Sequence, residues 1–320
     1  MMNSRREFIK NTAFGAAALY VSPYQEYLNE LKKVKKIGIQ LFSLPKSLDK
    51  DFVGSVKMLA QMGYKELELF GPYPFSDTAA IEGWKQAGKM LGFNGSGYFG
   101  KTTKEVKMIL DDNGLTSPTA HTDFATLLNN MDKLGEAGAI LGHKYVVLPA
   151  IPDDKRKTLD DYKRTAEAFN KIGENAKKVG LKFAYHNHGY GFKAVDGKIP
   201  FDFLMEQTDP NLVFLEMDIF WTAAAGIDPI AYLDKYGKRY RLLHLKDMKT
   251  KKTFSGDGGN MGQWMELFPS MTTAGDGVMD LAGIVKKAQS LGIKHYLVEQ
   301  DMVAQPEIAL KRSIDFLKKG

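Results

Sequence analysis

The sequence predicts a single α/β domain, a (β/α)8 barrel, because three observations agree. From Lys36 onward, short apolar runs alternate with stretches whose apolar residues recur every three or four positions, as in amphipathic helices. Eight such runs can be counted, and several follow a helical stretch that ends in glycine. Four runs break into His, Asp or Glu at their carboxyl ends. Repeated strand–helix units favour parallel strands with right-handed crossovers, and eight units favour a closed barrel over an open sheet.

The predicted strands are short, and helical stretches separate them. In chain order they span residues 37–42, 66–70, 116–121, 144–149, 181–186, 213–218, 241–245 and 296–299. The segment 162–172 is typical of the helical stretches, with apolar residues at intervals of three or four. Gly63, Gly180 and Gly292 stand where such helices would end. Glycine accepts the left-handed conformation that turns a helix into the next strand.

Two connections are much longer than the others. They span residues 72–101, after predicted strand two, and 248–277, after predicted strand seven. The first contains a further helix-like stretch at 78–91. Because both follow the carboxyl end of a strand, we expect them over the open face of the barrel as lids or walls, with a surface excursion as the alternative. The barrel domain is predicted to span residues 31–320.

Strong metal ligands stand at the carboxyl ends of the last four predicted strands. They are His186, Asp218, His244 and Glu299, with His188 on the same strand face as His186. In a (β/α)8 barrel these ends converge on one face, so residues far apart in sequence would surround one point. Two imidazoles and two carboxylates suit one divalent ion such as Mn, Co, Zn or Fe, with Mg also open. Each residue alone could instead be a satisfied polar group at a strand end, and the choice between His186 and His188 stays open.

Lys246, two residues after His244, is a predicted acid or base. An ammonium beside a divalent ion is disfavoured, so we expect the pKa of Lys246 to fall toward the range useful for proton transfer. A solvated lysine at the barrel rim is the alternative. His121 ends strand three and could reach a substrate, while Gln40 and Glu68 could hydrogen-bond to a sugar.

The composition excludes several classes of function. The chain has 320 residues, of which 44% are hydrophobic and 26% charged, as in globular proteins. It has no cysteine, which excludes disulfides, thiolate catalysis and cysteine-rich zinc sites. The net charge is +6, but the lysines are scattered without interleaved aromatic residues, so no nucleic-acid partner is expected. The GSGYFG sequence at 95–100 lacks the strand–helix context of a dinucleotide site.

The amino terminus forms a segment of its own. Residues 4–10 read SRREFIK and precede a mostly apolar stretch at 12–21. A paired arginine before a short apolar run resembles a twin-arginine export signal, so residues 1–30 are predicted to be such a signal and the protein to be periplasmic. The stretch is too short and too weakly apolar for a stable membrane anchor, which needs about 20 residues. A fortuitous Arg-Arg pair on an amphipathic helix is the alternative.

Seven short motifs carry a resemblance to a known family. They are IQLF (39–42), GYKELE (63–68), YHNH (185–188), LEMDIFW (215–221), HLKD (244–247), AGDG (274–277) and VEQD (298–301). In this order they resemble the xylose-isomerase-like TIM barrel superfamily, and within it the group called sugar phosphate isomerase/epimerase. The resemblance implies that strands five to eight bind the metal ion through the four residues named above. Relatives that are epimerases usually carry glutamate where this chain has His186, so we expect Glu299 to keep the role of base, with His188 or Lys246 as the second group.

The resemblance implies an enolisation. A metal-bound ketone is polarised, and a carboxylate such as Glu299 removes the neighbouring proton. Our first hypothesis is an isomerase or epimerase of an unphosphorylated sugar or derivative, and the second is a lyase or hydrolase that cleaves 3-keto-glycosides by β-elimination. A nuclease would need more histidines than the six present, and a sugar-binding protein without activity is a further alternative. The expected partner is a small carbohydrate, and self-association into a homo-oligomer stays open. The predicted substrate contacts are Gln40, Glu68, His121, Glu216 and Trp221.

Overall fold

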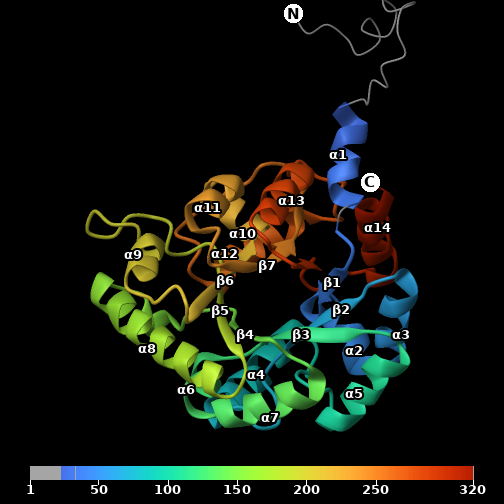
Figure 1. Ribbon diagram of the computed structural model, residues 1–320, viewed down its shortest axis with the longest axis horizontal. Helices are drawn as coiled ribbons and strands as arrows, with labels where there is room; N and C mark the ends of the chain where they lie inside the picture. Colours follow the sequence, from blue (N-terminus) through green and yellow to red (C-terminus); the bar gives the residue numbers. More distant parts are fainter. Residues whose placement is uncertain (1–22, 33, 320) are drawn as a thin grey trace, which may run out of the picture.

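Eight parallel strands close into a barrel at the centre of the molecule, and helices surround it (Figure 1). The computed structural model describes residues 23–32 and 34–319. In chain order the barrel strands are β1 (Ile37–Gln40), β2 (Glu66–Phe70), β3 (Thr116–His121), β4 (Tyr145–Leu148), β5 (Lys182–His186), β6 (Val213–Asp218), β7 (Tyr240–Leu245) and β10 (His295–Val298). Each pairs in parallel with the next, and β10 closes the barrel against β1. The predicted (β/α)8 barrel is confirmed.

All eight predicted strands are present, with small shifts at their ends. The first stops at Gln40 because the chain turns into the 3-10 helix η1 (Leu41–Ser43), where the side chain of Gln40 accepts the N–H of Phe42 at 3.1 Å. Gly63 and Gly180 have φ angles of 106° and 79°. These left-handed conformations confirm their predicted role as helix-terminating glycines.

Helices cover the outside of the barrel. They are α2 (Pro45–Lys50), α3 (Phe52–Met62), α5 (Thr103–Asp112), α6 (Phe124–Asn129), α7 (Met131–Leu141), α8 (Leu159–Lys178), α9 (Pro200–Glu206), α10 (Ile219–Ala224), α11 (Pro229–Tyr236), α13 (Leu281–Ser290) and α14 (Pro306–Lys319), with the 3-10 helix η2 (Asp153–Lys155). Helix α8 shows how they pack. Phe169 and Ile172 are fully buried, and the ring of Phe169 lies 5.0 Å from that of Phe183 on β5. Burial of each such side chain contributes about 1.5–3 kcal/mol.

Apolar side chains fill the interior of the barrel. A buried cluster there comprises Tyr145, Val147, Ala184, Leu242 and Leu297, from β4, β5, β7 and β10. Polar side chains replace them toward the carboxyl ends of the strands, where Glu68, Glu216 and His244 are each fully buried. The barrel is therefore a packed core with a polar layer at one end.

Helix α1 (Pro23–Lys32) precedes the barrel. It packs against α13 and α14, and Leu31 is fully buried (Figure 1). This helix spans the predicted boundary between residues 30 and 31. The twin-arginine motif and the apolar stretch after it lie outside the described residues. Among those that are described, no helix combines the length and the apolar character needed to cross a membrane.

The two long connections fold over the carboxyl face of the barrel. The first contains α4 (Thr78–Leu91), as predicted. The second contains α12 (Met261–Leu267), the 3-10 helix η3 (Phe268–Ser270), and a two-stranded antiparallel sheet of β8 (Asp247–Met248) and β9 (Met271–Thr272). The carboxylate of Asp247 accepts the N–H groups of Gly275 and Gly277 at 2.9 and 3.1 Å, which fastens this connection to the end of β7.

Candidate active site

A cavity of about 380 Å³ opens at the carboxyl ends of the strands, as expected for this fold. Its polar lining residues are His121, Thr122, Asp123, His186, His188, Lys246, Glu299 and Asp301. The rest of the lining is mostly apolar and comes from the strand ends and from both long connections. The predicted convergence of distant residues on one face is therefore seen in the structure, and the two long connections do form walls.

Asp218, His244 and Glu299 form one group of metal-ligating side chains. Their ligand atoms lie within 4.8 Å of one another, and all three residues are buried. His244 Nδ1 is 2.7 Å from Glu299 Oε2 and 4.0 Å from Asp218 Oδ2. Asp218 ends β6 and caps α10, because its Oδ1 accepts the N–H of Trp221 at 3.0 Å. This cap fixes the carboxylate so that Oδ2 is turned toward the group.

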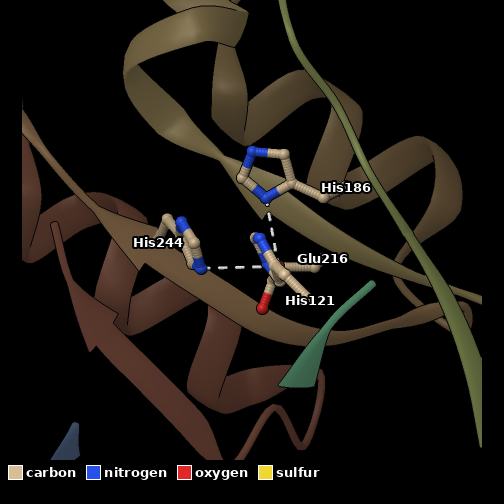
Figure 2. Close-up of side chains that lie close together, drawn as sticks. All are labelled: His121, His186, Glu216 and His244. Carbon is tan, nitrogen blue, oxygen red and sulfur yellow. Dashed lines mark hydrogen bonds and ion pairs between the residues drawn. The ribbon is translucent and has the colours of Figure 1, made fainter. Parts of the chain in front are cut away.

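His121, His186, Glu216 and His244 form a second group that shares His244 with the first. Glu216 Oε2 lies at its centre, 2.8 Å from His121 Nε2, 3.0 Å from His186 Nδ1 and 3.4 Å from His244 Nε2 (Figure 2). The other ring nitrogen of His186, Nε2, is 3.7 Å from Asp218 Oδ2. His186 therefore connects the two groups.

Glu68, in the buried interior of the barrel, fixes the ring of His244. Its Oε2 is 2.6 Å from His244 Nε2 and accepts the amide of Gln40 at 2.7 Å, while its Oε1 accepts the hydroxyl of Thr119 at 2.7 Å. Gln40, Glu68 and Glu216 are all fully buried, and none lines the cavity. The structure thus corrects the expectation that these three contact a substrate: Glu68 and Glu216 hold histidines, and Gln40 donates to Glu68.

Lys246 differs most from its predicted state. Its Nζ lies 2.9 Å from Asp218 Oδ2, 2.8 Å from Glu299 Oε2 and 2.7 Å from Asp301 Oδ2. Burial alone would lower the pKa of Lys246, but the three carboxylates raise it well above its usual range. The fall of this pKa was expected beside a bound divalent ion; in the metal-free site the three carboxylates instead favour the charged ammonium of Lys246. The same ammonium, with His244, holds the pKa of Glu299 below its usual range although burial raises it.

Asp301 is a site residue that the sequence analysis did not select. It lines the cavity, and burial together with the charge of Glu299 raises its pKa to about 7. It stands two residues after Glu299, at the end of the same VEQD motif. The two-residue alternation that grouped His186 with His188 would have grouped Asp301 with Glu299 as well.

His188 lines the cavity but belongs to neither ligand group. Its Nδ1 lies 2.7 Å from the carbonyl oxygen of Pro149, so Nδ1 carries the hydrogen and Nε2 has a free lone pair. Its ring lies 4.6 Å from that of Trp264 and 5.7 Å from that of Trp221. Burial and the charge of Lys246 lower the pKa of His188 to about 3, so the imidazole is neutral.

The remaining predicted substrate residues do reach the cavity. His121 and Trp221 both line it, His121 from the end of β3 and Trp221 from α10. His121 also lies 3.2 Å from Glu68 Oε2 in addition to its contact with Glu216. His121 thus faces the cavity from the edge of the buried polar layer.

The donor set fits a divalent metal ion. The predicted ligands offer imidazole nitrogen and carboxylate oxygen, which borderline divalent ions accept. His186 Nδ1 and His244 Nε2 are held by Glu216 and Glu68, the carboxylate support that metal-ligating histidines commonly have. His186, Asp218, His244 and Glu299 would hold the ion. This geometry favours His186 over His188, because His186 belongs to one of the two ligand groups and His188 to neither.

Comparison with known proteins agrees with this fold and site. Residues 56–320 match the xylose isomerase-like TIM barrel family, and the chain belongs to it. A sugar phosphate isomerase/epimerase from Parabacteroides distasonis has a similar structure, with a TM-score of 0.63 and 27% identity over 90% of this chain and 94% of that one. These findings confirm the predicted resemblance.

Two inosose dehydratases are similar in sequence. That of Lacticaseibacillus casei is 30% identical over 212 residues, which are 61% of this chain and 70% of the relative. That of Clostridium beijerinckii is 33% identical over 159 residues, which are 48% of this chain and 52% of the relative. This chain therefore matches about half of that relative's length. The IOLI protein, which binds a zinc atom, shares the fold alone, with a TM-score of 0.61 at 15% identity over 89% of this chain and 95% of that one.

Proposed function

We propose that this protein is a metal-dependent lyase that removes a proton next to the carbonyl of an unphosphorylated keto sugar derivative and expels a β-leaving group. The observation that carries the proposal is the contact of the Lys246 ammonium with Glu299 in the lining of the cavity, because it brings a charged acid and a carboxylate base together. Similarity to inosose dehydratases supports the elimination.

Glu299 is the proposed base. A divalent ion held by His186, Asp218, His244 and Glu299 would polarise the substrate carbonyl and so acidify the neighbouring C–H bond. Oε2 of Glu299 is held by His244 at 2.7 Å and by Lys246 at 2.8 Å. Oε1 is therefore the atom that takes the proton, in a carboxylate whose orientation is already fixed.

Lys246 is the proposed acid. As the bond between carbon and the leaving oxygen breaks, Nζ of Lys246 gives a proton to that oxygen, which leaves as water or an alcohol. Asp301 lies 2.7 Å from Nζ and has a pKa of about 7, so it can return a proton to the lysine. Neutral His188 offers Nε2 as an acceptor for a substrate hydroxyl.

The second candidate is an isomerase or epimerase that uses the same proton removal. The similarity to the Parabacteroides distasonis isomerase/epimerase across 90% of this chain favours it, as does the free Nε2 of His188, which could serve as a second proton carrier. The two candidates differ in their products, since only elimination shortens or dehydrates the substrate.

Proton exchange measured by NMR in D2O tests the proposal. The protein is incubated with 3-keto-glucosides and with ketoses, with a chelator and then with Zn2+ or Mn2+ restored. We expect metal-dependent exchange of the proton next to the carbonyl, together with loss of the leaving group. The Lys246→Met variant should keep exchange but lose elimination, whereas Lys57→Met on the exposed face of α3 should change neither. Exchange with epimerised product and no elimination would select the second candidate, and absence of exchange in metal-loaded protein would refute both.

A further inference from the structure

The cavity has two chemically different halves. The ionisable groups of the inner half come from the strand ends, and the proposed reaction uses them. In the outer half, Phe42, Phe70 and Trp84 line one wall, while Met261, Trp264 and Phe268 line the wall supplied by the second long connection. The inner half offers hydrogen-bonding groups for the hydroxyls of a sugar, whereas these two walls offer apolar surface to whatever is attached to it.

The two tryptophans of the outer half have no polar edge to offer a ligand. Nε1 of Trp84 donates to the carbonyl of Asn94 at 3.0 Å, and Nε1 of Trp264 donates to the carbonyl of Gly258 at 2.7 Å. Their hydrogen-bonding capacity is therefore used within the protein, and only aromatic carbon remains for contact with a bound group.

The aromatic wall is built before any ligand arrives. The rings of Phe42 and Phe70 meet edge to face at 5.3 Å, and those of Phe70 and Trp84 lie 5.7 Å apart. Trp84 also rests against Phe93 at 5.7 Å. Rings that support one another in this way form a fixed surface, and flat aromatic groups pack on such surfaces by offset or edge-to-face contact.

The charges of the cavity disfavour an anionic substituent. Its lining has one Lys or Arg, Lys246, which three carboxylates already bind. Asp123 also lines it, and this carboxylate accepts the N–H and the hydroxyl of Thr126 at 2.8 and 2.6 Å. A phosphate would meet these carboxylates without a free cation among the described lining residues, and the apolar walls favour an attached group without charge.

We infer that the outer half of the cavity is a subsite for a neutral aromatic aglycone, so that the substrate is an aryl glycoside rather than a free sugar. The inference rests on the proposed function, because the sugar part is assigned to the inner half. It extends that function by specifying the leaving group as a phenol-type alcohol.

Binding of unreactive probes tests the subsite separately from the chemistry. Isothermal titration calorimetry would compare phenyl β-D-glucopyranoside with methyl β-D-glucopyranoside, neither of which has the keto group. Burial of a phenyl ring should make the phenyl glycoside bind at least about tenfold more tightly. Equal affinity for the two glycosides, or no detectable binding of either, would overturn the subsite.

Two substitutions locate the effect. Met261→Asp places a charge beside the outer half at a residue that is 38% exposed, and it should weaken phenyl glycoside binding while leaving the methyl glycoside unchanged. Met108→Asp, at a 58% exposed methionine on α5, is the matched control and should change neither. Trp84→Leu should act like Met261→Asp. A uniform loss for both glycosides in these variants would refute the inference.

The outcomes separate the subsite from the reaction. A phenyl preference without proton exchange on keto sugars would retain the subsite and reject the lyase. Exchange and elimination on keto sugars without a phenyl preference would retain the lyase and reject the subsite.

Discussion

Nζ of Lys246 lies 2.8 Å from Oε2 of Glu299, the carboxylate that we assign both to metal binding and to proton removal. The same ammonium lies 2.9 Å from Oδ2 of Asp218, a second proposed ligand. Two cations therefore compete for the same oxygen atoms. The lysine neutralises the carboxylates in the metal-free protein, and a bound ion must share them with it or displace it.

Replacement of Lys246 by methionine should strengthen metal binding and weaken the metal-free protein. Without the ammonium, Asp218 and Glu299 are free for the ion, so we expect Zn2+ affinity to rise by about tenfold or more in a chelator competition assay. The metal-free variant should lose about 3–5 kcal/mol of stability in urea unfolding, because buried carboxylates are left unpaired. Unchanged affinity would mean that lysine and metal do not compete.

Glu68→Gln should weaken metal binding although Glu68 is not a proposed ligand. The carboxylate fixes His244 through Nε2 at 2.6 Å. Loss of such support typically lowers metal affinity by about 10–100-fold, and we expect a loss of roughly that size here. Glu66 is the matched control, since it pairs with His295 at 2.8 Å from the other end of the same strand. Calorimetry with Zn2+ should give wild-type affinity for Glu66→Gln. Equal losses of Zn2+ affinity in both variants would mean that Glu68→Gln acts through general destabilisation of the protein and not through His244.

His143 should make the protein less stable in mild acid. Burial lowers its pKa to about 4, against an ordinary 6.5, although the carbonyl of Ser117 accepts a hydrogen bond from its Nδ1. Between pH 4 and 6.5, His143 is therefore protonated in the unfolded chain but neutral in the folded protein. This stability is fully present above pH 6.5 and is lost as the pH falls toward 4, by about 3 kcal/mol in all.

Urea unfolding of wild type and His143→Asn at pH 7.5, 5.5 and 4.5 measures this effect. Asparagine can keep the hydrogen bond to Ser117 but does not titrate, so the difference between the two proteins should shrink as the pH falls. Parallel stability curves would assign the acid sensitivity to other groups.

Gly189→Ala should disturb the wall of the cavity. A Cβ at this position would clash with the ring of Phe254, which stacks on Trp221 with centroids 5.6 Å apart. We expect a loss of about 1–3 kcal/mol from overpacking, with a shift of tryptophan fluorescence. Gly83→Ala is the control, and it should stabilise the protein instead of destabilising it. Apart from its own helix, no atom of the described residues lies within 4 Å of its Cβ position in α4, so the variant should gain about 1 kcal/mol from helix propensity.

The fold could be predicted because its signals are local. Apolar spacing and terminal glycines mark each strand–helix unit along the chain, and alternation along a strand decides which side chains share a face. These rules brought His186, Asp218, His244 and Glu299 to one end of the barrel, where the structure has them. The same rule applied to the VEQD motif would have added Asp301.

The state of each site residue could not be predicted in this way. Gln40, Glu68 and Glu216 point inward as alternation requires, but their depth in the barrel keeps them out of the cavity lining, where Glu68 and Glu216 hold histidines and Gln40 holds Glu68. The chain by itself thus determined the barrel and the strand ends on which the polar residues gather. Only the tertiary structure decided the charge of Lys246, because a pKa depends on the carboxylates that surround it in space, and Asp218 of β6 is far along the chain from Glu299 and Asp301.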